Sequence, residues 1–108
     1  MAAGIFDINI NEGDTFVLSL EFWSNEDNTI PLDLTLIEFS GAFQIGSKYI
    51  PMVCTKSTDI INVMTATVSY SQMTDLSTQG KYDIDSIQDG ERFRVIQGSV
   101  KINKEVTV

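Results

Sequence analysis

The side chains that could do chemistry in this sequence are carboxylates and one thiol, because the chain contains no histidine. That absence removes the usual general base, the usual metal ligand and any nucleophile activated by an imidazole. Cys54, the one cysteine, lies in an apolar run, so we expect an inert, partly buried thiol and no disulfide within the chain. We therefore predict that the protein is not an enzyme and uses no cofactor.

Two carboxylates, Asp83 and Asp85, are spaced to lie on one face of a strand, about 7 Å apart. Paired carboxylates can carry out acid–base chemistry or hold calcium. Ile87 stands where a calcium loop would have its third acidic ligand, and Arg94 is expected to neutralise one of the pair. We therefore predict a solvated sheet face without a metal. Two other acidic pairs fall in predicted loops, where calcium is the minority interpretation: Glu12 with Asp14, and Glu26 with Asp27.

Trp23 is a second candidate for a binding role. It points away from the apolar row of its own strand, and a polar loop follows at residues 24–29. It either covers the second face of that strand or is an exposed anchor for a partner protein or a sugar ring.

Alternating apolar and polar residues predict half-buried strands along most of the chain. The positions expected to face inward are Phe16, Leu18, Leu20 and Phe22; Ile37, Phe39, Gly41, Phe43 and Ile45; and Tyr82, Ile84, Phe93 and Val95. Two further rows share one face of a strand: Phe6, Ile8 and Ile10, which alternate with Asp7 and Asn9, and Met64, Ala66, Val68 and Tyr70. Gly41 either leaves a hole for a bulky neighbour or marks a bend, and Pro51 indicates an edge strand. One short helical turn is expected near residues 71–76.

An Asp89-Gly90 pair between two alternating runs predicts a β-hairpin. In that register Arg94 faces Asp85 as an exposed cross-strand pair. Continuing the same alternation would turn Val100 and the next apolar residues outward. We therefore predict a β-bulge at Gly98, which returns Val100 and Ile102 to the core.

The length of 108 residues suits one domain with one core. With 15 acidic against 7 basic residues, the formal net charge is -8, so nucleic acid and membrane surfaces are poor partners. No apolar run approaches the roughly 20 residues of a membrane span, and the first residues do not suggest a signal peptide. We predict an all-β fold: a single antiparallel, immunoglobulin-like β-sandwich of about seven or eight strands over residues 1–108, with extended arms at residues 1–10 and 103–108.

Several short motifs together resemble the small β-sandwich modules of tailed-bacteriophage virions. They are GIFDININEGDTF at residues 4–16, IPLDLT at 30–35, GKYDID at 80–85, the Asp89-Gly90 hairpin, and GSVKI at 98–102 leading to EVT at 105–107. The likeness covers nearly the whole chain, but it departs at residues 70–78, which are rich in serine and threonine. It also departs at Phe39, where an arginine-containing strand is more usual.

The resemblance implies a structural virion protein, assembled in the host cytoplasm, that binds other virion proteins in the tail, baseplate or fibre-attachment region. Such a module binds through strand edges and tails, and a homo-oligomer is compatible with this role. The candidate interface residues are Ile5, Phe6, Ile8, Ile10, Trp23, Val106 and Val108. The alternative for residues 4–10 and 103–108 is that they complete the domain's own sheet.

Three other functions compete with this one. Capsid decoration uses the same type of sandwich. Carbohydrate binding is suggested by Trp23, Tyr49 and the acidic loops, and it requires exposed aromatic side chains grouped on one surface. Hydrolysis by paired carboxylates is disfavoured, because no histidine and no second cleft-forming element are present.

Overall fold

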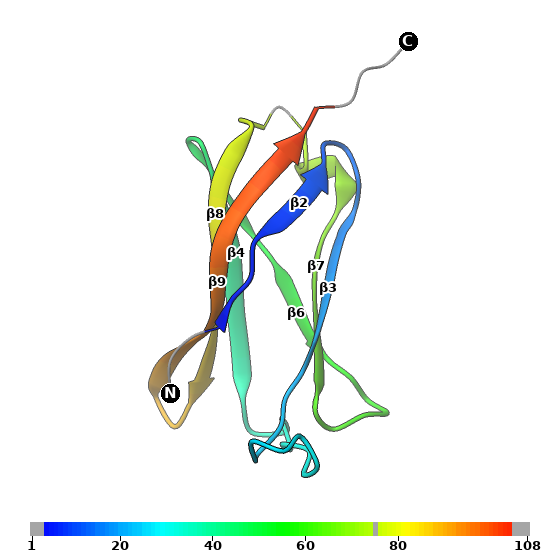
Figure 1. The fold of residues 1–108 in the computed structure, drawn as a ribbon, viewed down its shortest axis with the longest axis vertical. Coiled ribbons are helices and arrows are strands. Elements are labelled where there is room, and N and C mark those ends of the chain that lie inside the picture. The colour runs from blue at the N-terminus through cyan, green and yellow to red at the C-terminus, as the bar shows by residue number, and fades with distance from the viewer. Residues whose placement is uncertain (1–3, 75, 105–108) are drawn as a thin grey trace.

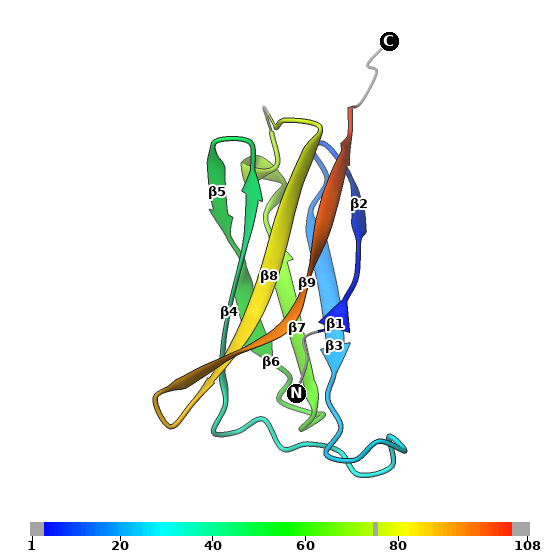
Figure 2. The same ribbon diagram turned by 60° about the vertical axis from the view of Figure 1, so that its left-hand side comes forward.

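The computed structural model describes residues 4–74 and 76–104, whose strands form two packed sheets (Figures 1 and 2). In the larger, six-stranded sheet the order is β1-β9-β8-β4-β5, and β2 also pairs with β9. Its strands are β1 (Gly4–Ile5), β2 (Ile8–Asn11), β4 (Glu38–Ile45), β5 (Lys48–Pro51), β8 (Gln79–Gln88) and β9 (Glu91–Asn103). The smaller sheet has the order β3-β7-β6, with β3 (Phe16–Glu21), β7 (Val63–Val68) and β6 (Val53–Lys56). The predicted all-β sandwich is confirmed.

Helical structure within the described residues is limited to the 3₁₀ turn η1 (Tyr70–Gln72), which begins one residue before the predicted turn. The Ser69 hydroxyl caps this turn by accepting a hydrogen bond from the Ser71 N–H. The alternation placed Tyr70 on the same strand face as Val68, but β7 ends at Val68. Tyr70 therefore does not extend the buried row of β7, and its side chain is exposed. No helix in this part of the chain is long and apolar enough to cross a bilayer.

The core fills the space between the two sheets with the inward rows that the alternation predicted. Phe16 of the smaller sheet and Phe43 of the larger one meet edge to face, with ring centroids 4.9 Å apart. Phe43 also lies 6.0 Å from the ring of Tyr82 on the neighbouring strand. Edge-to-face contacts of this kind add about 0.5–1.5 kcal/mol to the burial of the rings. Aromatic side chains therefore join the two sheets where β3 begins and β4 approaches its end.

The core leaves no room for a side chain at Gly41. A Cβ atom there would lie 2.9 Å from Cγ1 of Ile84 and 3.1 Å from Sδ of Met52. The hole expected from the sequence is therefore filled by bulky neighbours. Met52 itself lies where the chain leaves β5 at one edge of the larger sheet and enters β6 at an edge of the smaller one. Pro51 lies on an edge strand, as expected.

The N-terminal segment differs from the predicted antiparallel arrangement, because β1 and β2 both run parallel to β9. Between the two short strands, Asp7 binds β9 with its side chain: Oδ1 accepts a hydrogen bond from the Ser99 N–H at 3.0 Å. The Phe6 carbonyl accepts a hydrogen bond from the Tyr82 hydroxyl at 2.5 Å. Residues 4–11 thus complete the domain's own sheet. The described residues form nine strands, because the N-terminal segment and the segment over residues 48–56 are each divided into two.

The β8–β9 hairpin forms with Asp89 and Gly90 at its tip, both at positive φ. The predicted bulge at Gly98 is in the wrong place, since the register shifts where Ile84 pairs with Ile96, leaving Val95 as the extra residue. This earlier shift turns Ile96 toward the core. Its consequence for the following residues is the predicted one: Val100 and Ile102 are buried.

Phe93 was expected in the core and is instead exposed. It pairs with Ser86 and has the inward alternation, but it lies near the tip of the hairpin, which extends past the body of the sandwich in Figure 2. The alternation of a strand therefore does not report burial where the opposite sheet has ended.

Gly98 permits the close approach of the N-terminal edge, because a Cβ atom there would lie 2.1 Å from the Phe6 carbonyl oxygen. We predict that Gly98→Ala lowers the free energy of unfolding by about 1–3 kcal/mol, as the backbone of residues 6–7 is pushed away. Gly4→Ala is the matched control, since its Cβ would lie 3.8 Å from the Val95 carbonyl oxygen, an ordinary contact. Urea unfolding of both variants measures the difference. Equal stability of the two variants would contradict the close packing of the Phe6 carbonyl against Gly98.

Candidate functional site

The N-terminal edge was the predicted interface, and the structure divides its residues into two groups. Ile8 and Ile10 face inward on β2 and are buried in the core, so they cannot contact a partner directly. Ile5 faces outward and Phe6, although it has the inward alternation, stays more than half exposed at the edge of the sheet. Of this part of the interface, Ile5 and Phe6 are therefore available to a partner.

The other interface candidates lie elsewhere. Trp23 follows β3, forms an isolated antiparallel bridge with Pro31 and is half-buried, so it covers its own strand more than it anchors a partner. Val106 and Val108 lie outside the described residues. At the C-terminal arm, Asn103 ends β9 opposite Asn11 and thus also completes the sheet.

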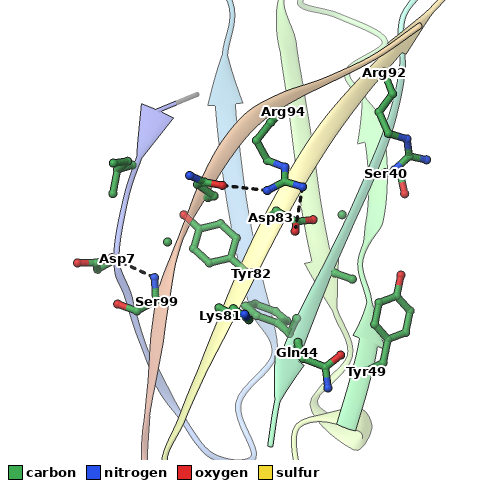
Figure 3. A pocket seen from close by; sticks show the side chains of 16 residues that line it. Asp7, Ser40, Gln44, Tyr49, Lys81, Tyr82, Asp83, Arg92, Arg94 and Ser99 are labelled. Atoms are coloured by element: carbon green, nitrogen blue, oxygen red, sulfur yellow. Dashed lines mark hydrogen bonds and ion pairs between the residues drawn. The ribbon is translucent and has the colours of Figure 1, made fainter. Parts of the chain in front are cut away.

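A polar hollow lies on the outer face of the larger sheet, the face turned away from the core (Figure 3). Its volume is about 770 Å³. Four elements and the N-terminal edge contribute polar side chains: Ser40 and Gln44 from β4, Tyr49 from β5, Lys81 and Asp83 from β8, Arg92, Arg94, Gln97 and Ser99 from β9, and Asp7. The hollow exists because every second residue of neighbouring strands points to this face.

Asp85 lies on the same outward row as Asp83 and forms the centre of an ion-pair cluster. Its Oδ1 accepts a hydrogen bond from Nε of Arg94 at 2.8 Å, and its Oδ2 accepts one from the Arg92 guanidinium at 2.9 Å. The second terminal nitrogen of Arg94 lies 3.5 Å from Asp83, and the first donates to Gln97 at 2.9 Å. The predicted Arg94–Asp85 pair is therefore present. It is not fully exposed as predicted, because the two arginines leave only 5% of Asp85 accessible.

The electrostatics of the hollow follow from these contacts. The hydrogen bond that Arg94 donates to Asp85 and the nearby charge of Asp83 raise the pKa of the Arg94 guanidinium. The Ser99 backbone N–H lowers the pKa of Asp7. The three cations of the hollow are balanced by Asp7, Asp83 and the underlying Asp85, so the hollow has no net formal charge in a chain of net charge -8.

Arg92 was not recognised as part of this cluster from the sequence. The signal was present, because Arg92 and Arg94 are two residues apart on one strand and must share a face. The hairpin register also places Arg92 opposite Ile87, diagonal to Asp85. The hollow's remaining members, such as Asp7 and Tyr49, are joined by pairings that the sequence does not specify.

The other predicted chemical residues have structural surroundings. Cys54 of β6 is partly buried, and burial raises the pKa of its thiol. Glu12 accepts hydrogen bonds from Nζ of Lys104 at 2.6 Å and from the Leu76 N–H at 3.1 Å. Within residues 4–74 and 76–104, no three cysteine, aspartate or glutamate side chains are grouped so that they could hold a metal ion.

Comparison of the sequence with models of known protein families finds no match. Comparison with curated proteins likewise finds no similar sequence.

Asp85 should matter more for stability than its neighbour Asp83, because it is buried and accepts from two arginines. We predict that Asp85→Asn lowers the free energy of unfolding by about 2 kcal/mol, since both guanidinium groups lose a charged acceptor. Asp83→Asn, which removes one half-exposed contact, should cost less than about 1 kcal/mol. Urea unfolding compares the two. A larger loss for Asp83→Asn would contradict the assigned cluster.

Glu12 should contribute stability that depends on pH. The hydrogen bond from Lys104, followed by that from Leu76, lowers the pKa of this carboxyl in the folded protein. A lowered folded pKa stabilises the protein above the unfolded pKa, about 4.3, and this stability is lost as the pH falls through the folded value. The midpoints of urea unfolding of wild type and Glu12→Gln should therefore differ near neutral pH and converge in acid. A difference that stays constant down to acid pH would contradict this.

Proposed function

We propose that the chain is a structural protein of a tailed-bacteriophage virion, which mediates protein–protein assembly in the tail, baseplate or fibre-attachment region. The motifs that carry the resemblance have clear roles in forming the domain. The turn after residue 11 leads into β3, and the motif at 80–85 forms most of the first part of β8. In the motif at 30–35, Oδ1 of Asp33 accepts hydrogen bonds from the N–H and hydroxyl of Thr35, while Leu34 is buried.

The observation that carries the proposal is the exposure of apolar side chains along the strands at the edges of both sheets. At the edge of the larger sheet these are Ile5 and Phe6. On the outer face of the smaller sheet, Val17 of β3 and Val53 of β6 flank Thr67, which pairs with both. Edge strands also present unpaired backbone groups, so a neighbouring protein can add a strand while its side chains cover the exposed apolar ones.

Two other functions make different use of the same molecule. A capsid-decoration protein would bind through the same edges, and its location in the particle is what distinguishes it. A carbohydrate-binding module is favoured by exposed Tyr49 in the polar hollow. It is disfavoured because Trp23 belongs to the side of the smaller sheet and is half-buried, so the two aromatic side chains do not form one platform.

The test is the position of the chain in particles of the phage that encodes it. Mass spectrometry of purified particles should detect the chain, and a density map should place it in the tail, with a neighbouring protein against the N-terminal edge. Ile5→Ser with Phe6→Ser should reduce its incorporation several-fold, because these side chains are exposed and not needed for the core. Tyr70→Ser, which removes an exposed side chain elsewhere, is the control.

Density on the capsid shell would favour decoration. Absence of the chain from the particles would overturn the proposal.

A further inference from the structure

One end of the sandwich collects exposed apolar side chains from three parts of the chain. Residues 22–37, residues 57–62 and the tip of the β8–β9 hairpin lie at this end in both views (Figures 1 and 2). We call it the loop end. Five large apolar side chains in these segments are each more than half exposed: Ile30, Leu36, Ile60, Ile61 and Phe93. At the opposite end, the corresponding exposed side chain in η1 is Tyr70.

Two of the loops are joined by hydrogen bonds. The Leu34 N–H donates to the Ile61 carbonyl at 3.0 Å, and the Phe22 N–H donates to the Asn62 carbonyl at 2.9 Å. The buried Asn62 side chain returns a hydrogen bond to the Phe22 carbonyl. Leu36 and Ile61 are therefore presented from a connected backbone.

Each loop is also braced internally. Oδ1 of Asn25 accepts hydrogen bonds from the N–H groups of Thr29 and Ile30, which fixes the loop that carries Ile30. The Ser57 hydroxyl accepts hydrogen bonds from the N–H groups of Asp59 and Ile60. A surface that is already ordered loses less conformational entropy when it binds a partner.

The hairpin extends the apolar row of the core to this end. Phe39, Ser86 and Phe93 pair in sequence across β4, β8 and β9, and the ring of Phe39 lies 5.2 Å from that of Phe22. Phe93 is therefore the exposed continuation of a row that is covered at Phe39. A partner side chain placed against Phe93 would lengthen this row.

The charges at the loop end indicate which partner fits. Within residues 22–37, 57–62 and 87–93 the sequence has six carboxylates and one cation, Arg92, which is already paired with Asp85. Lys56, just before the second segment, also reaches this end, where its Nζ donates to the Thr35 carbonyl at 3.1 Å and lies 3.9 Å from Glu38, so carboxylates still outnumber cations. The carboxylates are Glu26, Asp27, Asp33, Asp59, Asp89 and Glu91. A second copy of the chain would bring like charges together, and nucleic acid would be repelled.

From the exposed apolar side chains and the carboxylates of the same segments, we infer that the loop end is a docking surface for a basic protein segment that contributes large apolar side chains. Apolar contacts supply most of the affinity, and the carboxylates of the same segments select lysine- and arginine-bearing partners. This inference rests on the proposed function only in that the chain binds proteins. It names a different surface from the strand edges.

The test uses a random peptide library selected on the purified chain. Enriched peptides should carry net positive charge and at least two large apolar residues. Leu36→Ser with Ile60→Ser should weaken their binding by about tenfold or more. Asp27→Asn, Asp59→Asn and Asp89→Asn together should weaken it several-fold, and raising the salt from about 50 to about 300 mM should remove most of that difference.

Tyr70→Ser is the control, because it removes a large exposed side chain at the opposite end of the sandwich, in η1. Its binding of the enriched peptides should equal that of the wild type. Three results would overturn the inference: no enriched peptide, enriched peptides of acidic composition, or binding that the control reduces as much as the loop-end variant does. None of these results bears on whether the chain is found in particles, so the two proposals can fail separately.

Discussion

The single extra residue at Val95 determines how the second half of β9 faces, and the rest of the domain depends on that direction. Below the bulge, Arg94 points to the outer face and reaches Asp85; above it, Ile96, Val100 and Ile102 point to the core. Without the shift, these apolar side chains would be exposed to water. Burying each aliphatic side chain is worth roughly 1.5–3 kcal/mol, so the alternative register is strongly disfavoured.

The same register also builds both surfaces that border β9. It places Gly98 opposite Tyr82, where the missing side chain lets the Phe6 carbonyl approach and accept the tyrosine hydroxyl. It places Gln97 on the outer face, where it accepts from Arg94. The parallel N-terminal edge and the polar hollow are thus two consequences of one irregularity in a strand.

Much of this fold was predictable because period-two patterning and turn chemistry are local. The inward rows of β3, β4 and β7, the Asp89-Gly90 hairpin and the need for a bulge all followed from residues close in sequence. The position of the bulge was predicted wrongly, at Gly98, although the extra residue is Val95. A correct choice could have come from Gln97, because a bulge at Gly98 would have directed that polar side chain into the core.

The candidate surfaces were harder to predict than the fold, because they are made by elements far apart in sequence. The alternation showed that Ile8 and Ile10 share an apolar strand face. Whether that face contacts a partner or the domain's own core depends on the pairing of β2 with β9, which the alternation does not specify. The arginine cluster was half predicted, through Arg94 alone. The convergence of three loops at one end of the sandwich requires the complete strand order, which no local pattern supplies.

The distribution of charge connects these surfaces. The cations of β8 and β9 are gathered on the outer face of the larger sheet, where Asp83 and Asp85 neutralise Arg94 and Arg92. With Arg92 and Arg94 paired there, segments 22–37, 57–62 and 87–93 keep an excess of carboxylates, even though Lys56 at their border donates to the Thr35 carbonyl. The net charge of -8 is therefore not spread evenly: the hollow is balanced, and the loop end is acidic. A protein with this arrangement can attract a basic partner to one end. The edges of its sheets remain available to a second kind of neighbour, whose charge matters less for binding because strand addition depends on backbone hydrogen bonds.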